Sequence, residues 1–257
     1  MNDIFSLVGK NAVVIGGAGG IGQAIAKGLA FYGANVAIAS RKLEGLQKAA
    51  QEIKDEVNKE IKIFQVDAGS EESIIALVET VVSDMGRVDI LVNSQGLNLK
   101  HNALEFNMED WDKVFNINVK GLMMCCKEFG KVMVKQNYGR IINVSSVRGA
   151  RACGNGNAGY CSSKGAVDMM TRTLSFEFAP YNITVNAVGP TLTETPMMEN
   201  FFNQNPQIKE TLSKSHPLGR LGTPEDMIGP SVFLASEAAG YVTGQIIYAD
   251  GGLTAIG

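Results

Sequence analysis

Cysteine and histidine are scarce in this chain of 257 residues, and their spacing argues against the usual metal sites. The four cysteines form no CxxC pair, and only two histidines are available to complete a Cys/His cage. We therefore expect reduced thiols and no metal site. The residues concerned are Cys125, Cys126, Cys153, Cys161, His101 and His216.

Long apolar runs and clusters of positive charge are also missing. No segment is apolar over the roughly 20 residues that a membrane helix needs, and no cationic leader precedes an apolar stretch at the N-terminus. Lysine and arginine total 23 against 26 aspartates and glutamates, which gives a net charge of −3 and no basic footprint for nucleic acid. We expect a cytoplasmic protein with neither a membrane nor a nucleic-acid partner.

Internal repeats, low-complexity tracts and charge-rich linkers are absent as well, so we expect one domain over residues 1–257. What the chain does contain is a regular alternation of apolar strand-like runs and helical stretches. The predicted strands are 11–15, 35–39, 62–66, 90–92, 140–144, 184–187 and 245–248, and the predicted helices are 23–32, 43–59, 71–85, 108–136, 160–178 and 224–235. This order predicts an α/β fold with a doubly wound parallel sheet, Rossmann-like, with helices on both faces.

A glycine-rich stretch, GGAGGIG at 16–22, lies between the first predicted strand and the first predicted helix. Exposed backbone N–H groups and the positive end of a helix dipole favour a pyrophosphate at such a turn. The stretch fits GxGxxG through Gly17, Gly19 and Gly22, and it also fits GxxxGxG through Gly16, Gly20 and Gly22. It predicts a dinucleotide site.

The end of the second predicted strand bears on the choice of dinucleotide. NAD-binding proteins of this class carry an acidic residue there, whereas this chain reads Ser40, Arg41, Lys42. Arg41 offers a planar fork of donors suited to a 2′-phosphate. We therefore expect NADP(H), with NAD(H) as the alternative if Arg41 and Lys42 are only exposed charges that open the next helix.

Tyr160 and Lys164 are four residues apart in a predicted helix, so their side chains share one face. A phenol is a poor base at neutral pH, but a nearby cation favours the phenolate and lowers the pKa. The pair therefore predicts a proton-transfer site, although this spacing also occurs on solvated helix faces.

Several motifs in order resemble those of the short-chain dehydrogenase/reductase family, from Gly9 to the end of the chain. Besides the glycine turn and the Tyr160/Lys164 pair, they are Asp67, NSQG at 93–96, NVKG at 118–121, NVSS at 143–146, VNA at 185–187 with Pro190, and YVTG at 241–244. The surroundings of 96–101 and of Trp111 are similar to the gluconate 5-dehydrogenase branch of the family. Three positions depart from the family pattern, namely Ile15, Gln95 and Thr191.

The resemblance implies that Tyr160 is the general acid/base, that Lys164 lowers its pKa, that Ser146 bonds the substrate oxygen and that Asn118 anchors a relay water. It assigns adenine to Asp67 and the ribose side of the cofactor to Asn93. Simpler alternatives are that Asn118 and Asp67 only cap backbone groups, and that Ser145 faces the site instead of Ser146. The cofactor-binding residues expected overall are Gly16, Gly19, Gly20, Ile21, Gly22, Ser40, Arg41, Lys42, Asp67, Ala68, Asn93, Gly96, Tyr160, Lys164, Pro190, Thr193 and Thr195.

The expected substrate side is the loop 147–159, which carries Arg148, Arg151, Asn155 and Asn157. Together with Lys100 and His101, these groups suit a sugar acid or polyol. Apolar residues of the expected lid would suit a less polar carbonyl compound; they are Met197, Met198, Phe201 and Phe202.

The sequence thus predicts an NADP(H)-dependent oxidoreductase that interconverts a secondary alcohol and a ketone on a small polar substrate. One alternative is a reductase of 3-oxoacyl thioesters or other carbonyl compounds, and another is a non-catalytic dinucleotide-sensing regulator. The family resemblance further implies a homotetramer, a dimer of dimers, built through the helices predicted at 108–136 and 160–178.

Overall fold

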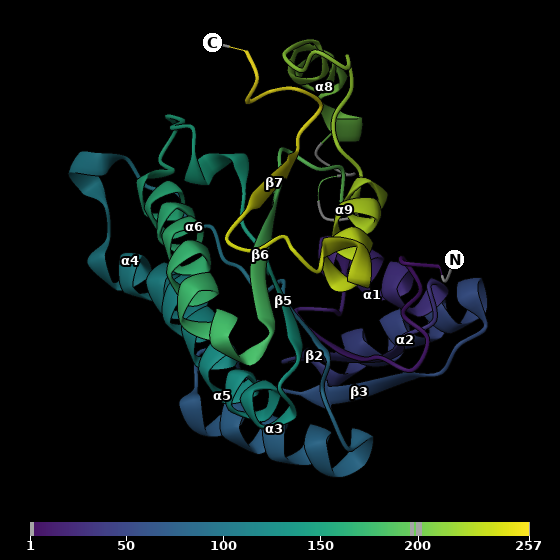
Figure 1. The fold of residues 1–257 in the computed structure, drawn as a ribbon. Coiled ribbons are helices and arrows are strands. Elements are labelled where there is room, and N and C mark those ends of the chain that lie inside the picture. The colour runs from purple at the N-terminus through teal and green to yellow at the C-terminus, as the bar shows by residue number, and fades with distance from the viewer. Residues whose placement is uncertain (1–2, 196–197, 199–201, 257) are drawn as a thin grey trace.

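The computed structural model describes residues 3–195, 198 and 202–256, and its strands form one parallel sheet. The order across the sheet is β3-β2-β1-β4-β5-β6-β7 (Figure 1). The strands are β1 (Asn11–Ile15), β2 (Asn35–Ser40), β3 (Ile61–Gln65), β4 (Ile90–Asn93), β5 (Gly139–Val144), β6 (Ile183–Pro190) and β7 (Ile246–Ala249). The predicted fold class is confirmed.

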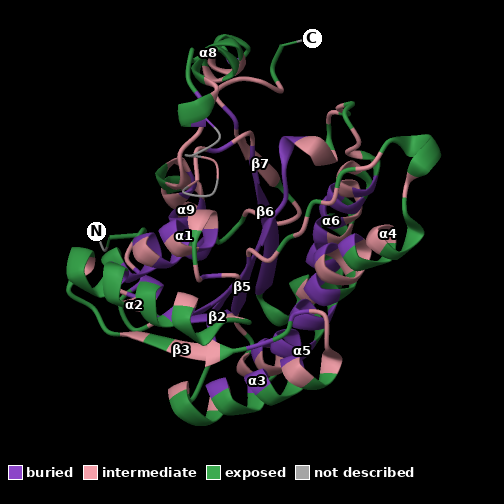
Figure 2. Ribbon diagram, turned by 180° about the vertical axis from the view of Figure 1, so that it is seen from behind, coloured by how far each residue is buried: buried purple, intermediate pink, exposed green. Residues whose placement is uncertain are grey.

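Helices cover both faces of this sheet, as Figures 1 and 2 show from opposite sides. One layer comprises α1 (Gly20–Phe31), α2 (Leu43–Val57) and α9 (Ile228–Ala235). The other comprises α3 (Glu71–Met85), α5 (Gly121–Gln136) and α6 (Ala158–Phe178), with α4 (Met108–Phe115) packed beside α6. A further helix, α8 (Pro206–Lys214), stands at the carboxyl edge of the sheet near the C-terminus.

The sheet is buried on both faces, which explains the continuous apolar runs in its strands. All five residues of β1 are buried. Ala12 and Val14 pack into the core under α1, α2 and α9, while Val13 and Ile15 pack into the core under α3, α5 and α6. The strand β1 therefore contributes alternate residues to two separate hydrophobic cores.

Local signals in the sequence set the ends of several helices. Ser70 caps α3 by accepting a hydrogen bond from the Ser73 N–H, and Gly86 ends that helix with a positive φ of 76°. Asn58 and Asn137 end α2 and α5 in the left-handed conformation, at φ 52° and 50°. The bounds of α3 and β1 are those predicted.

Three predicted elements are wrong in part. The helix expected at 224–235 begins as a 3-10 turn at Pro224–Met227, and α9 follows it. The continuous helix expected at 108–136 is divided into α4 and α5 by a π-turn at Asn116–Lys120. The strand expected at 184–187 runs further, as β6, from Ile183 to Pro190. No expectation covered α8, none of whose residues is buried.

The glycine turn lies where the strand order reverses, between β1 and its neighbour β4. Gly16 has φ +80°, and a Cβ there would lie 2.7 Å from the Ser94 backbone carbon. A Cβ on Gly22 would lie 2.3 Å from the Gly16 carbonyl oxygen, so the first turn of α1 folds tightly against β1. This reversal is where open parallel sheets bind their ligands. Among the described helices, none is both long and apolar enough to cross a membrane.

Candidate active site

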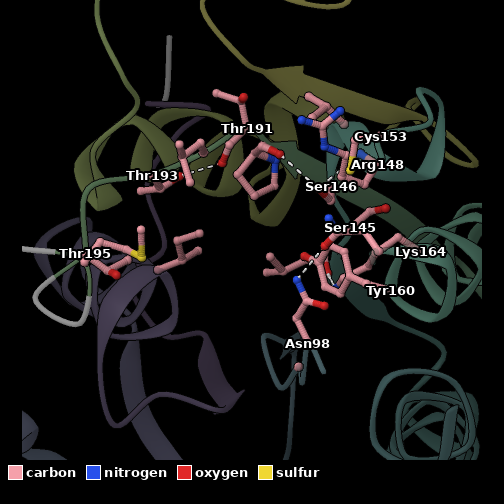
Figure 3. Close-up of a pocket in the computed structure, with 18 of the residues that line it drawn as sticks. Asn98, Ser145, Ser146, Arg148, Cys153, Tyr160, Lys164, Thr191, Thr193 and Thr195 are labelled. Atoms are coloured by element: carbon pink, nitrogen blue, oxygen red, sulfur yellow. Dashed lines mark hydrogen bonds between the residues drawn. The ribbon is translucent and has the colours of Figure 1, made fainter. Parts of the chain in front are cut away.

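A cleft of about 1010 Å³ opens at the carboxyl edge of the sheet (Figure 3). A smaller hollow of about 280 Å³ adjoins it, and the two share the wall formed by residues 94–97. The cleft reaches from the glycine turn to the first turn of α6, and the hollow lies over the ends of β1, β2 and β3. Together they form an elongated site along the edge where the strands end.

Tyr160 and Lys164 lie on the wall of this cleft, on one face of α6. The Lys164 Nζ atom is 5.7 Å from the centroid of the Tyr160 ring. It donates a 2.7 Å hydrogen bond to the carbonyl oxygen of Val144, the last residue of β5. Because Lys164 is only 4% exposed, burial lowers its pKa to about 8. The spacing of the pair therefore predicted its geometry.

The electrostatics of Tyr160 differ from those the resemblance implied. Burial raises the pKa of the Tyr160 phenol, because the phenolate would lose its hydration, and a hydrogen bond with the Ser146 side chain offsets this only in part. Lys164 is directed to the Val144 carbonyl and is itself stripped of water. In the protein without ligands, therefore, Lys164 does not bring the pKa of Tyr160 below its ordinary value.

Ser146 supplies the third polar group facing Tyr160 (Figure 3). Its Oγ atom accepts a 3.1 Å hydrogen bond from the Arg148 N–H and donates a 3.4 Å bond to the Pro190 carbonyl. The neighbouring Ser145 also touches the cleft, but its hydroxyl donates to Asp168 Oδ1. Ser146 therefore keeps the predicted position, and Ser145 does not replace it.

Asp168 is a buried carboxyl that the sequence reasoning missed. It lies on α6 four residues after Lys164, is 4% exposed, and accepts hydrogen bonds from Ser145 Oγ and, at 3.3 Å, from Tyr248 Oη. Burial raises the pKa of Asp168. The negative charge of Asp168 offsets part of the lowering that burial causes in the pKa of Lys164. The signal that could have found it is the spacing 160, 164, 168, which continues one helix face.

Asn118 lies in the π-turn between α4 and α5 and is 1% exposed. Its Oδ1 accepts a 2.7 Å bond from the Leu97 N–H, and its Nδ2 donates to the Leu97 carbonyl at 2.9 Å and to Ser163 Oγ at 3.0 Å. These bonds hold residues 96–97 beside the first turns of α6. The side chain therefore positions the cleft wall, and a relay water would have to use the backbone of the π-turn. Such turns recur at functional sites.

The side chain of Asn93 lies away from the cleft, so any contact of this residue with the ribose side of the cofactor stays a prediction. Its side chain is fully buried, and Nδ2 donates a 3.0 Å hydrogen bond to Asn143 Oδ1. Asn143 in turn donates to Thr171 Oγ1 at 2.9 Å, so the chain of amides joins β4 and β5 to α6. Asn93 faces the core because it shares the sheet face of Leu91, two residues earlier. Its side chain does not reach a ribose in the cleft.

Most of the other predicted cofactor residues lie on the walls. The cleft wall contains Gly19, Ile21, Gly22, Gly96, Tyr160, Lys164, Pro190, Thr193 and Thr195. The wall of the hollow contains Gly16, Ser40, Arg41, Asp67 and Ala68. Gly20 lies beside them, since a Cβ there would be 3.4 Å from Thr195 Cγ2. Lys42 is exposed at the start of α2, next to Arg41, and belongs to neither wall, so its contact with the cofactor stays a prediction.

The residues of this edge fit a dinucleotide. A Cβ on Gly19 would meet nothing within 4 Å, so open space adjoins the backbone at the N-terminus of α1. Arg41 follows β2 on the wall of the hollow, where the phosphate of NADP would lie. Asp67 Oδ1 accepts a 2.9 Å bond from the Gly69 N–H, so it shapes its own turn as well as lining the hollow.

The predicted substrate residues separate into two groups. Arg148 and Asn155 lie on the cleft wall, together with Lys100, Asn98 and Asn157. Arg151 does not, because its guanidinium donates to the Leu253 carbonyl in the C-terminal segment. That contact corrects the prediction for Arg151. His101 also leaves the wall and bonds Asp110 Oδ2 at 2.9 Å.

The opposite part of the cleft is apolar. Met198, Phe202, Ile208 and Leu212 line it, the last two from α8. Of the four lid residues considered from the sequence, Met197 and Phe201 lie outside the described residues. His216, which follows α8, is 4% exposed and bonds Thr191 Oγ1 at 3.0 Å through Nε2. This buried contact, which no sequence motif indicated, ties the chain just after α8 to the segment after β6.

No group of three or more His, Cys, Asp or Glu side chains in the described part of the chain could hold a metal ion. The polar groups that meet at the cleft are a phenol, an amine and a hydroxyl. They can hold a substrate oxygen and move a proton to or from it.

Comparisons with known proteins agree with this geometry. A family model described as enoyl-(acyl carrier protein) reductase matches residues 16–254. The chain is 39% identical to a 3-oxoacyl-(acyl-carrier-protein) reductase of Thermotoga maritima, over 96% of this chain and 98% of that protein. It is 33% identical to the gluconate 5-dehydrogenase of Gluconobacter oxydans, over 98% of this chain and 97% of that protein.

A solved structure is similar over its whole length. The crystal structure of a gluconate 5-dehydrogenase from Burkholderia cenocepacia, in complex with NADP and tartrate, matches with a TM-score of 0.92 at 30% identity and covers 99% of both chains. With the family match over nearly the whole length, the chain belongs to the short-chain dehydrogenase/reductase family, an oxidoreductase family acting on hydroxyl and carbonyl groups.

Proposed function

We propose that this protein is an NADP(H)-dependent oxidoreductase that interconverts a secondary alcohol and a ketone. The observation that carries the proposal is the meeting of Tyr160, Ser146 and Lys164 on the wall of a cleft that also contains the open glycine turn. When bound, the nicotinamide supplies the hydride chemistry, and the protein supplies position and proton transfer.

The roles of the three residues follow from their contacts. Ser146 holds the substrate oxygen by a hydrogen bond and stabilises charge that develops on it. Tyr160 exchanges the proton of that oxygen, donating it when a ketone is reduced and accepting it when an alcohol is oxidised. Because burial raises the pKa of Tyr160, the phenol of the cofactor-free protein is protonated at neutral pH, which is the form that donates a proton to a ketone.

Arg41 supports the choice of NADP(H). It lines the hollow beyond β2, where no carboxylate directly follows the strand. Arg41→Gln should weaken NADP binding roughly tenfold or more, since one charged bidentate contact contributes about 1.5–3 kcal/mol. It should leave NAD binding almost unchanged. Lys42→Gln changes the next residue, which is not on the wall, and should weaken NADP binding less. If the two substitutions weaken it equally, Arg41 is not the specific contact of the phosphate. Thermal shift titrated with each dinucleotide measures both.

The substrate proposed is a sugar acid or a related polyol. Its support is the polar wall, where Lys100 and Arg148 supply two cations and Asn98, Asn155 and Asn157 supply amides. Cations bind a carboxylate and amides bind hydroxyls, so this wall suits an anionic, hydroxylated compound. The gluconate 5-dehydrogenases among the relatives support the same class.

A 3-oxoacyl thioester is the second candidate. It is favoured by the apolar wall near α8, where Ile208 and Leu212 lie, and by the similarity to 3-oxoacyl-(acyl-carrier-protein) reductases. A screen with NADP(H), run in both directions over sugar acids, polyols and 3-oxoacyl thioesters, separates the two. Arg148→Gln should raise KM for a sugar acid and leave KM for an uncharged ketone, with Lys48→Gln on α2 as the exposed control.

The same screen tests the non-catalytic alternative. A dinucleotide-sensing regulator would bind NADP and turn over none of the compounds. The full set of Tyr160, Ser146 and Lys164 at the cleft favours an enzyme, because a sensor needs no proton donor facing the substrate side.

We also propose a homotetramer, a dimer of dimers, built through α5 and α6. Its support is the apolar surface of these helices. Met169 and Phe176 on α6 are 59% and 86% exposed, and Met123 and Met170 line a groove beside α4. Exposed apolar surface of this extent is typical of a contact between subunits.

A further inference from the structure

Two half-buried thiols lie in contact beside the catalytic tyrosine. Cys153, in the loop after β5, lines the cleft near Arg148 (Figure 3). Cys161 follows Tyr160 in the first turn of α6. Their Sγ atoms are 3.8 Å apart, although the residues are eight positions apart in sequence. Neither thiol has a part in the proton transfer proposed above.

The backbone around the pair allows the sulfurs to approach further. A disulfide bond is about 2.05 Å long, so the two sulfurs must close by less than about 2 Å. The Cys161 N–H is bonded to the Asn157 carbonyl at 2.9 Å, which holds that thiol to the helix. On the loop side, a Cβ on Gly154 would meet nothing within 4 Å, and Asn155 and Gly156 have positive φ. Asn157 Nδ2 donates to the Gly154 and Asn155 carbonyls at 2.8 and 3.3 Å, so the loop is tied to the start of α6. The open space beside Gly154 is where the backbone next to Cys153 could shift.

The surroundings of Cys153 differ from those of the other two cysteines. Burial raises the pKa of Cys153, and the neighbouring Cys161 adds to this, while the cations of Arg148 and Lys100 offset the rise only in part. Cys125 and Cys126 are fully buried in the core, and burial raises the pKa of both thiols, that of Cys126 to about 12. The chain thus contains two accessible thiols in contact and two inert ones that serve as internal references.

We propose that Cys153 and Cys161 form a reversible intramolecular disulfide when the protein meets a peroxide. One thiolate attacks a peroxide oxygen, the O–O bond breaks, and hydroxide leaves to give a sulfenic acid. The second thiolate then attacks that sulfur and displaces the hydroxyl, which leaves as water after protonation. Two thiols are oxidised by two electrons in total, and one hydrogen peroxide is reduced to two waters.

The disulfide would act on the substrate side of the cleft. It draws Cys153 toward α6 and fixes the loop that carries Arg148 and Asn155, while the glycine turn on the other wall is untouched. On the proposed function, KM for the substrate should rise roughly tenfold, because displacements near an ångström in a binding site have effects of this size or larger. NADP affinity should stay the same.

The test uses the purified full chain, treated with hydrogen peroxide in a mildly alkaline buffer. We expect the intact mass to fall by two hydrogen atoms, peptide mapping without reduction to join Cys153 to Cys161, and dithiothreitol to reverse both. Cys161→Ser should lose this product. Treatment of this variant with peroxide should cause no rise in KM that dithiothreitol reverses. These mass readouts do not depend on any activity, so a failed substrate screen would leave them standing.

Other products would contradict the proposal. They are a sulfinic acid on Cys153 with Cys161 still a free thiol, a disulfide between two chains, or oxidation of Cys125 or Cys126 at the same rate. If the disulfide forms with no change in KM, the inference that it controls substrate binding is wrong. A parallel fall in NADP affinity would also contradict that inference, because it would show a general distortion of the site.

Discussion

Tyr160 is the residue on which the chemistry depends most directly. Tyr160→Phe removes one hydroxyl from the cleft wall and leaves the ring in place. We expect the rate of turnover to fall by about 10²–10⁴-fold, the usual contribution of a positioned acid or base. NADP binding and the melting temperature should change little. Steady-state kinetics with a thermal melt measures both.

A matched substitution completes this test. Tyr241 is a fully exposed tyrosine in the last motif of the chain, and Tyr241→Phe should retain normal turnover. If Tyr160→Phe retains it too, the proton comes from another group, and the assigned acid/base is wrong.

Lys164 gives a prediction about stability rather than rate. Burial lowers its pKa from 10.5 to about 8, so between these values the unfolded chain binds more protons than the folded one. The free energy of unfolding therefore increases as the pH rises through this window, and the deprotonation of Lys164 accounts for roughly 3 kcal/mol of the increase. Lys164→Met lacks this dependence.

The measurement is urea unfolding of the cofactor-free wild type and variant across this pH range. Other groups titrate there as well, but they are common to both proteins and cancel in the difference. We expect the stability advantage of Lys164→Met to shrink as the pH rises from about 8 to 10.5. Parallel curves would show that Lys164 is hydrated in solution.

For single residues, the sequence predicted which side chains lie close together better than it predicted how deeply they are buried. Helical spacing placed Tyr160 beside Lys164, but it could not show that burial dominates the pKa of both groups. The period of two along β4 puts the Asn93 side chain on the side of Leu91 in the core, which its motif alone does not show. Asp168 was accessible to the same helical argument and was overlooked.

Whole elements were predicted where their residues enter a core. The strands and the helices on both sheet faces have apolar residues at regular spacing, and they were found. The helix α8 has no buried residue, because its two apolar residues on one face, Ile208 and Leu212, line the cleft instead of entering a core. The π-turn at Asn116–Lys120 escaped because it inserts one residue into the helical register while the apolar pattern on either side continues.

The junction of β1 and α1 gives a prediction at this scale. Gly22→Ala would place a Cβ 2.3 Å from the Gly16 carbonyl oxygen, so the helix and the strand must move apart. Overpacking of this kind costs about 1–3 kcal/mol of stability, and NADP binding should weaken as the turn shifts. Urea unfolding and a thermal-shift titration with NADP measure these effects.

Gly19→Ala is the comparison for this junction. Its φ is 169°, which any residue adopts, and its Cβ would meet no atom within 4 Å. Stability should stay normal while NADP binding weakens, because the methyl group enters the space beside the α1 N-terminus. Normal NADP binding by Gly19→Ala would place the pyrophosphate elsewhere.

For the whole molecule, the fold class followed from the order of strands and helices, because a parallel sheet can connect such elements in few ways. Subunit assembly did not follow in this way. It depends on which apolar surface stays uncovered after folding, and only the structure identifies Phe176 and Met169 as that surface on α6.

Phe176→Lys tests the proposed assembly. A charge at a contact between subunits must either be buried unpaired or push the subunits apart, so we expect the tetramer to dissociate into smaller species. Light scattering coupled to size-exclusion chromatography measures the mass of each. Phe31 on α1 is 71% exposed on the opposite face of the sheet, and Phe31→Lys should remain tetrameric. If Phe31→Lys dissociates and Phe176→Lys does not, the subunits meet through the layer of α1, α2 and α9, and α6 faces solvent.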